Sequence, residues 1–342
     1  MSIDLLSTYS FVERMYLQYP VIFGANFAFP FIYGPIFYIY TKIVTGNEEK
    51  FNVKYLLHFI PFLLAHFYVS PYYLLSHQEK LLKIDFYLNN VQPDFVFIGF
   101  FKPVSGIVYT VLSLRLIKNF DNKLKEAFSN IEKIKLDWLR FLISGTFVVW
   151  LVVACLFIVS AIFGLDKGPY DGIIYFFVSI FIYAIGYGAL NQPQVFNFKE
   201  DHKTIEATPS ADETVKSVKY VKSSLGEDDI QKIKSDLILL MEDEKLYRNA
   251  EITLTQLAEK LLVTNHNLSE VINTAFNKNF YDFINNYRVE EVKEKLLNPD
   301  YSSRNLLTIA FESGFSSKSS FNTIFKKHTN TTPSEFRRQA LI

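Results

Sequence analysis

The polar side chains best suited to bind a ligand lie close to the C-terminal end of the chain. Lys318, Ser319, Asn322 and Thr323 follow one another at helical spacing, so one helix face would present all four. A lysine can donate to O6 and N7 of guanine, and an asparagine can pair bidentately with adenine. Residues 313–342 hold five Lys or Arg and one Asp or Glu, whereas residues 240–312 hold eight and twelve. The final stretch is therefore the one that attracts a polyanion most strongly.

The sequence contains no clear motif for catalysis, metal binding or disulfide formation. No Gly-rich phosphate loop, Ser/His/Asp order or usable pair of carboxylates rises above background, so we expect no enzyme and no cofactor. His58 and His66 lie roughly 80° apart around a helix and do not form a metal pair by themselves, so no metal site is expected. The single cysteine, Cys155, excludes a disulfide scaffold.

Two helix-turn-helix units would position the polar side chains. The first begins with Thr253-x-x-Gln256, a capping box that satisfies free amides of a first helical turn. Its apolar stripe breaks at Val263–Asn265, and a second stripe runs from Leu268 to Phe276. A longer helix, Phe280–Leu297, would join this unit to the next.

The same pattern repeats after Asn298-Pro299. Asn305 would cap a helix over Leu306–Ser313, Gly314 can take the left-handed conformation that ends it, and Ser317 would cap the next helix. The second helix of such a unit enters the DNA major groove and turns its N-terminal residues to the base edges. The expected fold class is all-α, an N-terminal transmembrane helix bundle followed by a helical domain with two helix-turn-helix units.

Residues of these two units resemble the AraC/XylS-type DNA-binding domain. The resemblance covers about Leu237–Arg338, under a third of the chain. Asn330 stands where the family usually has Gly, and Val292 replaces a usual small Ala. The residues that match at the family's spacings are Ile309-Ala310, Gly314-Phe315, Ser319, Phe321, Phe325-Lys326-Lys327, Thr332-Pro333 and Phe336-Arg337. The layout of the whole chain also resembles membrane-bound members of the family found in Bacteroidetes-type bacteria.

The resemblance implies which side chains contact DNA. The base-reading positions of the second unit are Lys318, Ser319, Asn322 and Thr323, and those of the first unit are His266 and Ser269, followed by Glu270 and Asn273. The residues suited to phosphates are Ser316, Ser317, Lys326, Lys327 and Arg337. Because residues 313–342 carry a net charge of +4 and residues 240–312 one of −4, we expect the second unit to anchor the domain on DNA and the first to contribute less. Glu270 stands where family members often have a base, and we expect it to be a solvated or specificity-tuning residue.

The N-terminal half has the composition of a membrane domain. Aromatic residues make up 17% of the whole chain, and charged residues are about twice as frequent after residue 195 as before it. A membrane span needs about 20 mainly apolar residues. Five stretches fit, namely Pro20–Tyr40, Tyr55–Leu75, Phe95–Leu116, Phe141–Phe163 and Gly172–Leu190. A buried helical core in water is the alternative for these stretches.

Lysines in the loops predict the topology. Ile117–Arg140 is rich in Lys and Gly164–Asp171 is not, so the first loop is expected on the cytoplasmic side. The N-terminus is then external and everything after Leu190 is cytoplasmic. We expect a membrane domain of about five helices over residues 1–195, a cytoplasmic linker over 196–226 and the DNA-binding domain over 227–342, with its core at 237–338. The location is the bacterial inner membrane.

Lys102 lies inside the third expected span. A charge within the membrane is by default a hypothesis for a functional site, here for an anionic ligand. A lysine that snorkels to the external face is the equally weighted alternative.

The sequence therefore predicts a membrane-tethered, sequence-specific transcription regulator whose membrane half acts as a sensor. The implied partners are double-stranded DNA, the lipid bilayer, RNA polymerase (for an activator), a small-molecule or envelope signal, and a second copy of the chain. A transporter or membrane enzyme with a regulatory helix-turn-helix tail is the alternative, and a tail that binds protein in place of DNA is a third reading.

Overall fold

The computed structural model describes residues 2–46, 52–90, 92–163, 176, 179–180, 183 and 225–340. Every regular element within these ranges is helical, and one isolated antiparallel bridge pairs Phe128 with Thr253. This confirms the expected all-α class. The chain forms two compact units, which are described separately: an N-terminal unit (Met1–Asn119 and Leu136–Phe198) and a C-terminal unit (Phe120–Lys135 and Lys199–Ile342).

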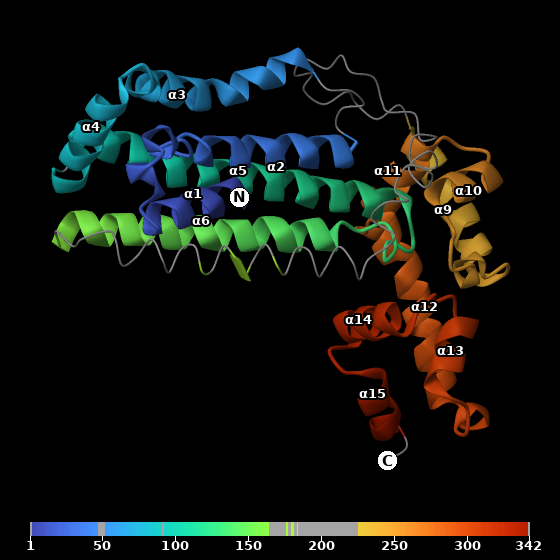
Figure 1. Cartoon of the computed structure of the whole chain (residues 1–342). Helices are drawn as coiled ribbons and strands as arrows, with labels where there is room; N and C mark the ends of the chain where they lie inside the picture. The colour runs from blue at the N-terminus through green and yellow to red at the C-terminus, as the bar shows by residue number, and fades with distance from the viewer. Residues whose placement is uncertain are drawn as a thin grey trace. The chain divides into compact units, whose positions relative to one another are not determined.

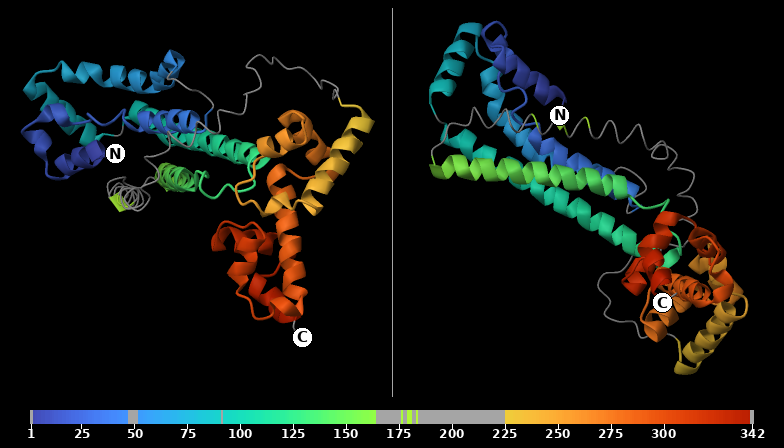
Figure 2. Two further views of the ribbon diagram at one scale, coloured as in Figure 1. Left: turned by 90° about the vertical axis from the view of Figure 1, so that its right-hand side faces the viewer. Right: turned by 90° about the horizontal axis from the view of Figure 1, so that it is seen from below.

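Long apolar helices dominate the N-terminal unit. In chain order the α-helices are α1 (Ser2–Val12), α2 (Pro30–Val44), α3 (Ile60–Tyr73), α4 (His77–Asn89), α5 (Pro93–Ala127, whose last residues belong to the C-terminal unit) and α6 (Asp137–Phe163). Figures 1 and 2 show α5 and α6 running side by side. They pack closely at Gly106 of α5, where an added Cβ would lie 2.2 Å from the ring of Trp150.

Three helices of the described residues are long and apolar enough to cross a membrane. They are Val53–Tyr73 (the 3₁₀ helix η3, Val53–Phe59, followed directly by α3), Pro93–Ala127 and Asp137–Ser160. These correspond to the second, third and fourth expected spans. Gly172–Leu190, the expected fifth span, lies outside the described residues except at four isolated positions.

The first expected span, Pro20–Tyr40, is not one helix. Its residues form a short 3₁₀ helix, Pro20–Ile22, then a turn with Gly24 at φ +73°, and then the first part of α2. A proline has no N–H to donate and is favoured in the first turn, so Pro30 begins α2 and does not continue an earlier helix. The 15 residues of α2 are fewer than a span requires.

Helices also replace expected loops. The stretch Ser76–Asp94, which joins the second and third expected spans and is expected as an external loop, contains α4, which begins with a capping box between Ser76 and Glu79. The third span continues as helix to Ala127, so that much of the expected cytoplasmic loop Ile117–Arg140 is the polar end of α5. A helix does not end where its apolar residues end, because it needs a stop signal and none occurs at Leu116.

The C-terminal unit is built on α12 (Phe280–Leu297), whose predicted bounds are confirmed. Figures 1 and 2 show α12 as a rod between two helical lobes. The first lobe contains α9 (Glu227–Glu242), α10 (Leu254–Lys260) and α11 (Asn265–Phe276), and the second contains α13 (Leu306–Glu312), α14 (Lys318–Thr329) and α15 (Pro333–Ala340). Each lobe packs its own apolar core against one half of α12.

Polar caps fix the ends of the short helices as the sequence predicts. Thr253 and Gln256 form the expected capping box, and the side chains of Asn305 and Ser317 accept backbone N–H groups at the starts of α13 and α14. Gly314 has φ +94°, and Asn330 has φ 60° at the end of α14. The turn of the second helix-turn-helix unit and the starts of α10, α13 and α14 are therefore set by local residue chemistry.

A segment between α5 and α6 also belongs to the C-terminal unit. This connecting segment, Phe120–Lys135, comprises the end of α5 and the loop after it. Ser129 at its centre is buried, donates from Oγ to Ile252 O at 2.7 Å, and accepts at its own carbonyl from Asn285 Nδ2 at 3.1 Å. The sequence pattern, which places the whole stretch before residue 195 in the membrane domain, does not anticipate this contact.

Candidate nucleic-acid interface

The second helix of the C-terminal helix-turn-helix unit, α14, has one apolar and one polar face. Phe321, Ile324 and Phe325 are buried in the core of the second lobe. The opposite face consists of the exposed side chains expected to read bases, Lys318, Ser319, Asn322 and Thr323. The helical repeat thus holds the apolar face against the core and turns these four polar residues outward together.

The N-terminal end of α14 is suited to a phosphate. Ser317 caps the helix by accepting the Ser320 N–H at 3.0 Å, and the neighbouring Ser316 is exposed. The free N–H groups and the dipole of a helix N-terminus attract anions. In this structure both serine side chains are engaged by the connecting segment: Ser316 Oγ accepts from Asn130, and Ser317 Oγ donates to Glu132.

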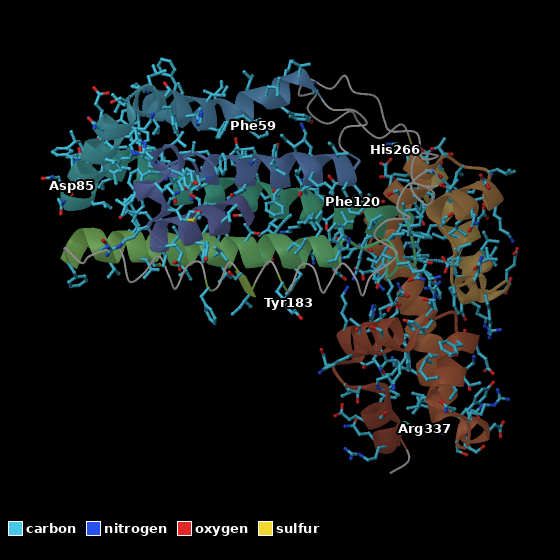
Figure 3. All side chains as sticks on the ribbon, viewed as in Figure 1. Phe59, Asp85, Phe120, Tyr183, His266 and Arg337 are labelled. Atoms are coloured by element: carbon cyan, nitrogen blue, oxygen red, sulfur yellow. The ribbon has the colours of Figure 1, made fainter. Side chains whose placement is uncertain are left out.

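The three basic residues expected at phosphates have different surroundings. Lys326 and Lys327 are exposed, and Lys327 Nζ lies 2.6 Å from the Asp282 carboxylate. Arg337, labelled on α15 in Figure 3, donates to Arg304 O at 2.7 Å and also to the carbonyls of two neighbouring residues. Its guanidinium therefore ties α15 to the loop before α13, and Lys326 is the residue of the three best placed for a phosphate.

The second helix of the first unit, α11, presents a weaker polar face. Leu268, Val271 and Ile272 are buried, so that His266 and Asn273 are exposed and Ser269 and Glu270 are half-buried; Figure 3 labels His266. The Glu126 carboxylate of the connecting segment accepts from Ser269 Oγ at 3.4 Å and from Asn273 Nδ2 at 3.5 Å.

A buried arginine of α12 binds the first lobe to the connecting segment. Arg288 is 2% exposed and donates to Tyr247 O at 2.7 Å, Asn249 O at 2.8 Å and Ser129 Oγ at 3.1 Å. Burial lowers the pKa of Arg288 to about 10, so the side chain stays charged at neutral pH. Its charge is stabilised by hydrogen bonds to uncharged oxygens, two of which, the Ser129 oxygens, come from the connecting segment.

A second ionic group joins α12 to the elements beside it. The Glu291 carboxylate lies 2.5 Å from Arg248 NH2 and 2.9 Å from Lys295 Nζ. Burial raises the pKa of Glu291, but the hydrogen bonds from Arg248 and Lys295 outweigh this and hold the pKa below the usual 4.5. The bond from Arg248 fixes α12 against the 3₁₀ helix Leu246–Arg248, which precedes the first helix-turn-helix unit. No cluster of His, Cys, Asp and Glu able to hold a metal ion occurs among the described residues.

Two helix-turn-helix units on one joining helix, each with an outward polar helix face, define a DNA-binding protein. Known proteins support this class. Residues 257–339 match a family model described as "Helix-turn-helix domain". The "Probable transcription factor PqrA" of Proteus vulgaris is 31% identical over 112 residues, which cover 33% of this chain and 88% of that protein. The chain therefore belongs to the AraC-type helix-turn-helix transcription regulators.

Two further matches each cover less than a third of the chain. An "Uncharacterized HTH-type transcriptional regulator" of Staphylococcus aureus (strain COL) is 30% identical over 93 residues, which are 27% of this chain and 12% of that protein. The structure of the C-terminal domain of the two-component response regulator yesN from Fusobacterium nucleatum is 28% identical over 32% of this chain and 98% of that chain, with a TM-score of 0.27. The chain thus spans only a small part of the staphylococcal relative.

Proposed function

We propose that the chain is a membrane-tethered regulator that binds specific DNA sequences through its C-terminal unit and senses a signal through its N-terminal unit. The observation that carries the proposal is the polar face of α14, where Lys318, Ser319, Asn322 and Thr323 are exposed together while the apolar face is buried. These side chains match base edges in the major groove, and Lys326 at the far end of the helix matches a phosphate. The second unit is the anchor, because residues 313–342 hold five Lys or Arg and one Asp or Glu, whereas residues 240–312 hold eight and twelve.

Exposed apolar side chains support the membrane tether. Phe67 in α3 is 78% exposed, and Ile162 and Phe163 in α6 are each 69% exposed. Large apolar surfaces of this kind are rare on proteins surrounded by water, and lipid would cover them. The lysines at the end of α5 and in the loop before α6 support a C-terminal unit in the cytoplasm of a bacterial cell, with the helices in the inner membrane.

Lys102 of α5 is the candidate for a ligand site within the membrane. Its ammonium lies 3.6 Å from the centre of the Phe27 ring, a cation–π distance. An anionic group of a small-molecule or envelope signal would compete with the ring for this charge. A Lys102→Met variant whose reporter response equals that of the wild type would remove the site from the proposal. RNA polymerase and a second copy of the chain are the further partners we propose.

The test is DNA binding by the full chain in lipid nanodiscs. Fluorescence anisotropy with a labelled duplex of mixed sequence, over a salt series, measures the affinity. Since binding releases counterions, log K is expected to fall linearly with log salt. Selection from a random duplex library then yields the preferred sequence. Indifference to every duplex in low salt, or full-length chain that stays in the supernatant after ultracentrifugation, would contradict the proposal.

A further inference from the structure

The connecting segment, Phe120–Lys135, lies on side chains that face DNA in the proposed function. In the first helix-turn-helix unit it contributes Glu126, whose carboxylate accepts from Ser269 and Asn273 of α11. Ser269 is one of the two expected base-reading residues of that helix. A carboxylate hydrogen-bonded to it occupies the place of a base edge.

The second unit has the same kind of contact. Asn130 Nδ2 donates to Ser316 Oγ at 2.8 Å, and the hydroxyl of Ser317 donates to the Glu132 carboxylate. Both serines stand at the N-terminal end of α14, where we expect a phosphate. The segment therefore puts one carboxylate against each of the two helix-turn-helix units.

Buried contacts hold the segment in place between these two ends. Ser129 is 1% exposed, and its carbonyl accepts from Asn285 Nδ2 at 3.1 Å and from Arg288 NH1 at 3.3 Å. Phe128 pairs with Thr253 in the isolated bridge. Breaking a buried hydrogen bond costs more free energy than breaking an exposed one, because water does not replace the lost partner. These contacts therefore favour the docked segment.

We propose that the connecting segment and DNA compete for one face of the C-terminal unit, so that the docked segment keeps the regulator in a closed state that does not bind DNA. This competition rests on the proposed function and would regulate the DNA binding that it describes. Duplex DNA is a polyanion, and it cannot occupy the sites at α11 and α14 while two carboxylates hold them. The segment also contains four lysines, so closure depends on where Glu126 and Glu132 lie and not on its net charge.

The position of the segment in the chain supplies a means of opening. It is continuous with α5 on one side and α6 on the other, and both helices meet the criteria for crossing a membrane. A signal that shifts the ends of α5 and α6 changes the free energy of the docked state directly. DNA affinity then falls or rises in proportion to the fraction of open molecules.

A disulfide can lock the segment without touching a proposed DNA contact. Opposed Cα atoms of an antiparallel pair lie about 4.5–5.5 Å apart, which a disulfide can span. The pair Phe128→Cys with Thr253→Cys, in the full chain with Cys155→Ser, uses the observed bridge. Binding of the mixed-sequence duplex is measured in nanodiscs, first oxidised and then reduced. We expect the oxidised form to bind at least about tenfold more weakly, and reduction to restore the affinity.

The outcomes separate the closed state from the proposed function. Each single-cysteine variant is the control and should be indifferent to oxidant. A cross-linked chain that binds DNA as tightly as its reduced form would overturn the closed state, and so would failure of the pair to form the disulfide. Reduced and single-cysteine chains that ignore the duplex in low salt would instead overturn the proposed function itself, and the competition with it.

Removal of the two carboxylates tests the same contact in the opposite direction. Glu126→Ala with Glu132→Ala is expected to raise affinity for the mixed-sequence duplex by on the order of tenfold. Loss of negative charge strengthens DNA binding anywhere on a protein, so the matched control is Asp236→Ala with Glu259→Ala, two exposed carboxylates on α9 and α10. An equal rise in both double variants would show that the segment does not compete with DNA.

Discussion

Two neighbouring lysines on α14 differ in whether a carboxylate already pairs with their ammonium group. Lys327 is paired with Asp282, whereas within the described residues Lys326 has no ion pair. We expect Lys326→Ala to weaken binding to all duplexes alike and to reduce the salt slope by about one, since each phosphate contact releases about one counterion. Lys327→Ala should have a smaller effect. Anisotropy over a salt series measures both, and an unchanged slope for Lys326→Ala would contradict the phosphate contact.

Asn322 tests base reading at the same helix. Its exposed amide can make two hydrogen bonds to an adenine, so Asn322→Ala should weaken binding to the selected sequence by about 1–3 kcal/mol and leave binding to scrambled duplex unchanged. The matched control is Gln231→Ala, which removes an exposed amide from α9. Competition binding with selected and scrambled duplexes compares the two. Equal losses of affinity for both duplexes would show that Asn322 contacts the DNA backbone or stabilises the fold and does not read a base.

Single residues also show what sequence patterns can and cannot predict. The caps Thr253, Asn305 and Ser317 were predictable because a cap acts on the backbone only two or three residues away. Arg337 was predicted at a phosphate, a role that stays a prediction, and the structure shows its guanidinium on carbonyls more than thirty residues away in the chain. A sequence gives the chemistry of a side chain but does not show which distant residue accepts its hydrogen bonds in the folded chain.

At the scale of elements, the turn of the second helix-turn-helix unit depends on Gly314. Its φ is +94°, and an added Cβ would lie 2.4 Å from Tyr247 O. We expect Gly314→Ala to lower the free energy of unfolding of the C-terminal unit by about 2–4 kcal/mol, from backbone strain and the clash together. Hydrogen–deuterium exchange of peptides from α12 to α14 measures the change.

Gly226 provides the control for this glycine. It has φ −69°, and an added Cβ would contact only Asp229 Oδ2 at 3.6 Å. Gly226→Ala should therefore cost less than about 1 kcal/mol, because it alters only a helix cap. Similar exchange rates in the two variants would mean that the turn at Gly314 is not what holds the second lobe in place.

The ionic group on α12 predicts how the C-terminal unit responds to acid. Since the pKa of Glu291 is below its usual 4.5 in the folded state, its contribution to stability is complete above about pH 4.5 and is lost as pH falls through the folded pKa. We expect Glu291→Gln to flatten the loss of stability in this range. Exchange measurements at a series of pH values test it, and parallel curves for the variant and the wild type would contradict the assignment.

Helices differ in how well the sequence predicts where they begin and end. The bounds of α12 follow from its apolar pattern and the Asn298-Pro299 stop, and they are as predicted. The end of α5 differs from the prediction. The expected span ends at Leu116 with its apolar residues, whereas the helix continues through polar residues to Ala127. Pro20–Tyr40 is mainly apolar, yet Pro30 starts a new helix within it. Hydropathy thus locates apolar surface better than it locates helix ends.

For the whole molecule, the least predictable feature is that Phe120–Lys135 belongs with the DNA-binding helices. Its hydrogen bonds to Ile252, to α11, to α12 and to Ser316 before α14 join residues more than a hundred positions apart, and such bonds have no periodic signature in the sequence. Composition divides the chain near residue 195, but the packing assigns a loop of the apolar half to the polar half. Because the C-terminal unit is made of two distant stretches, the chain passes between the two units more than once.

The proposed arrangement makes a definite prediction about sidedness. Lys123 and Lys125 lie in the last turns of α5, and Lys133 and Lys135 lie in the loop before α6; lysine-rich connections between spans remain in the cytoplasm. The contacts of this segment with the C-terminal unit then require that unit to be cytoplasmic as well. We expect protease added to inside-out membrane vesicles to remove a tag at residue 342, and the same protease to spare the tag in right-side-out vesicles. A tag on residue 1 that shows the same sidedness as the C-terminal tag would indicate an even number of spans. Loss of the C-terminal tag only from right-side-out vesicles would place the unit outside the cell, where neither DNA nor the proposed competition is available to it.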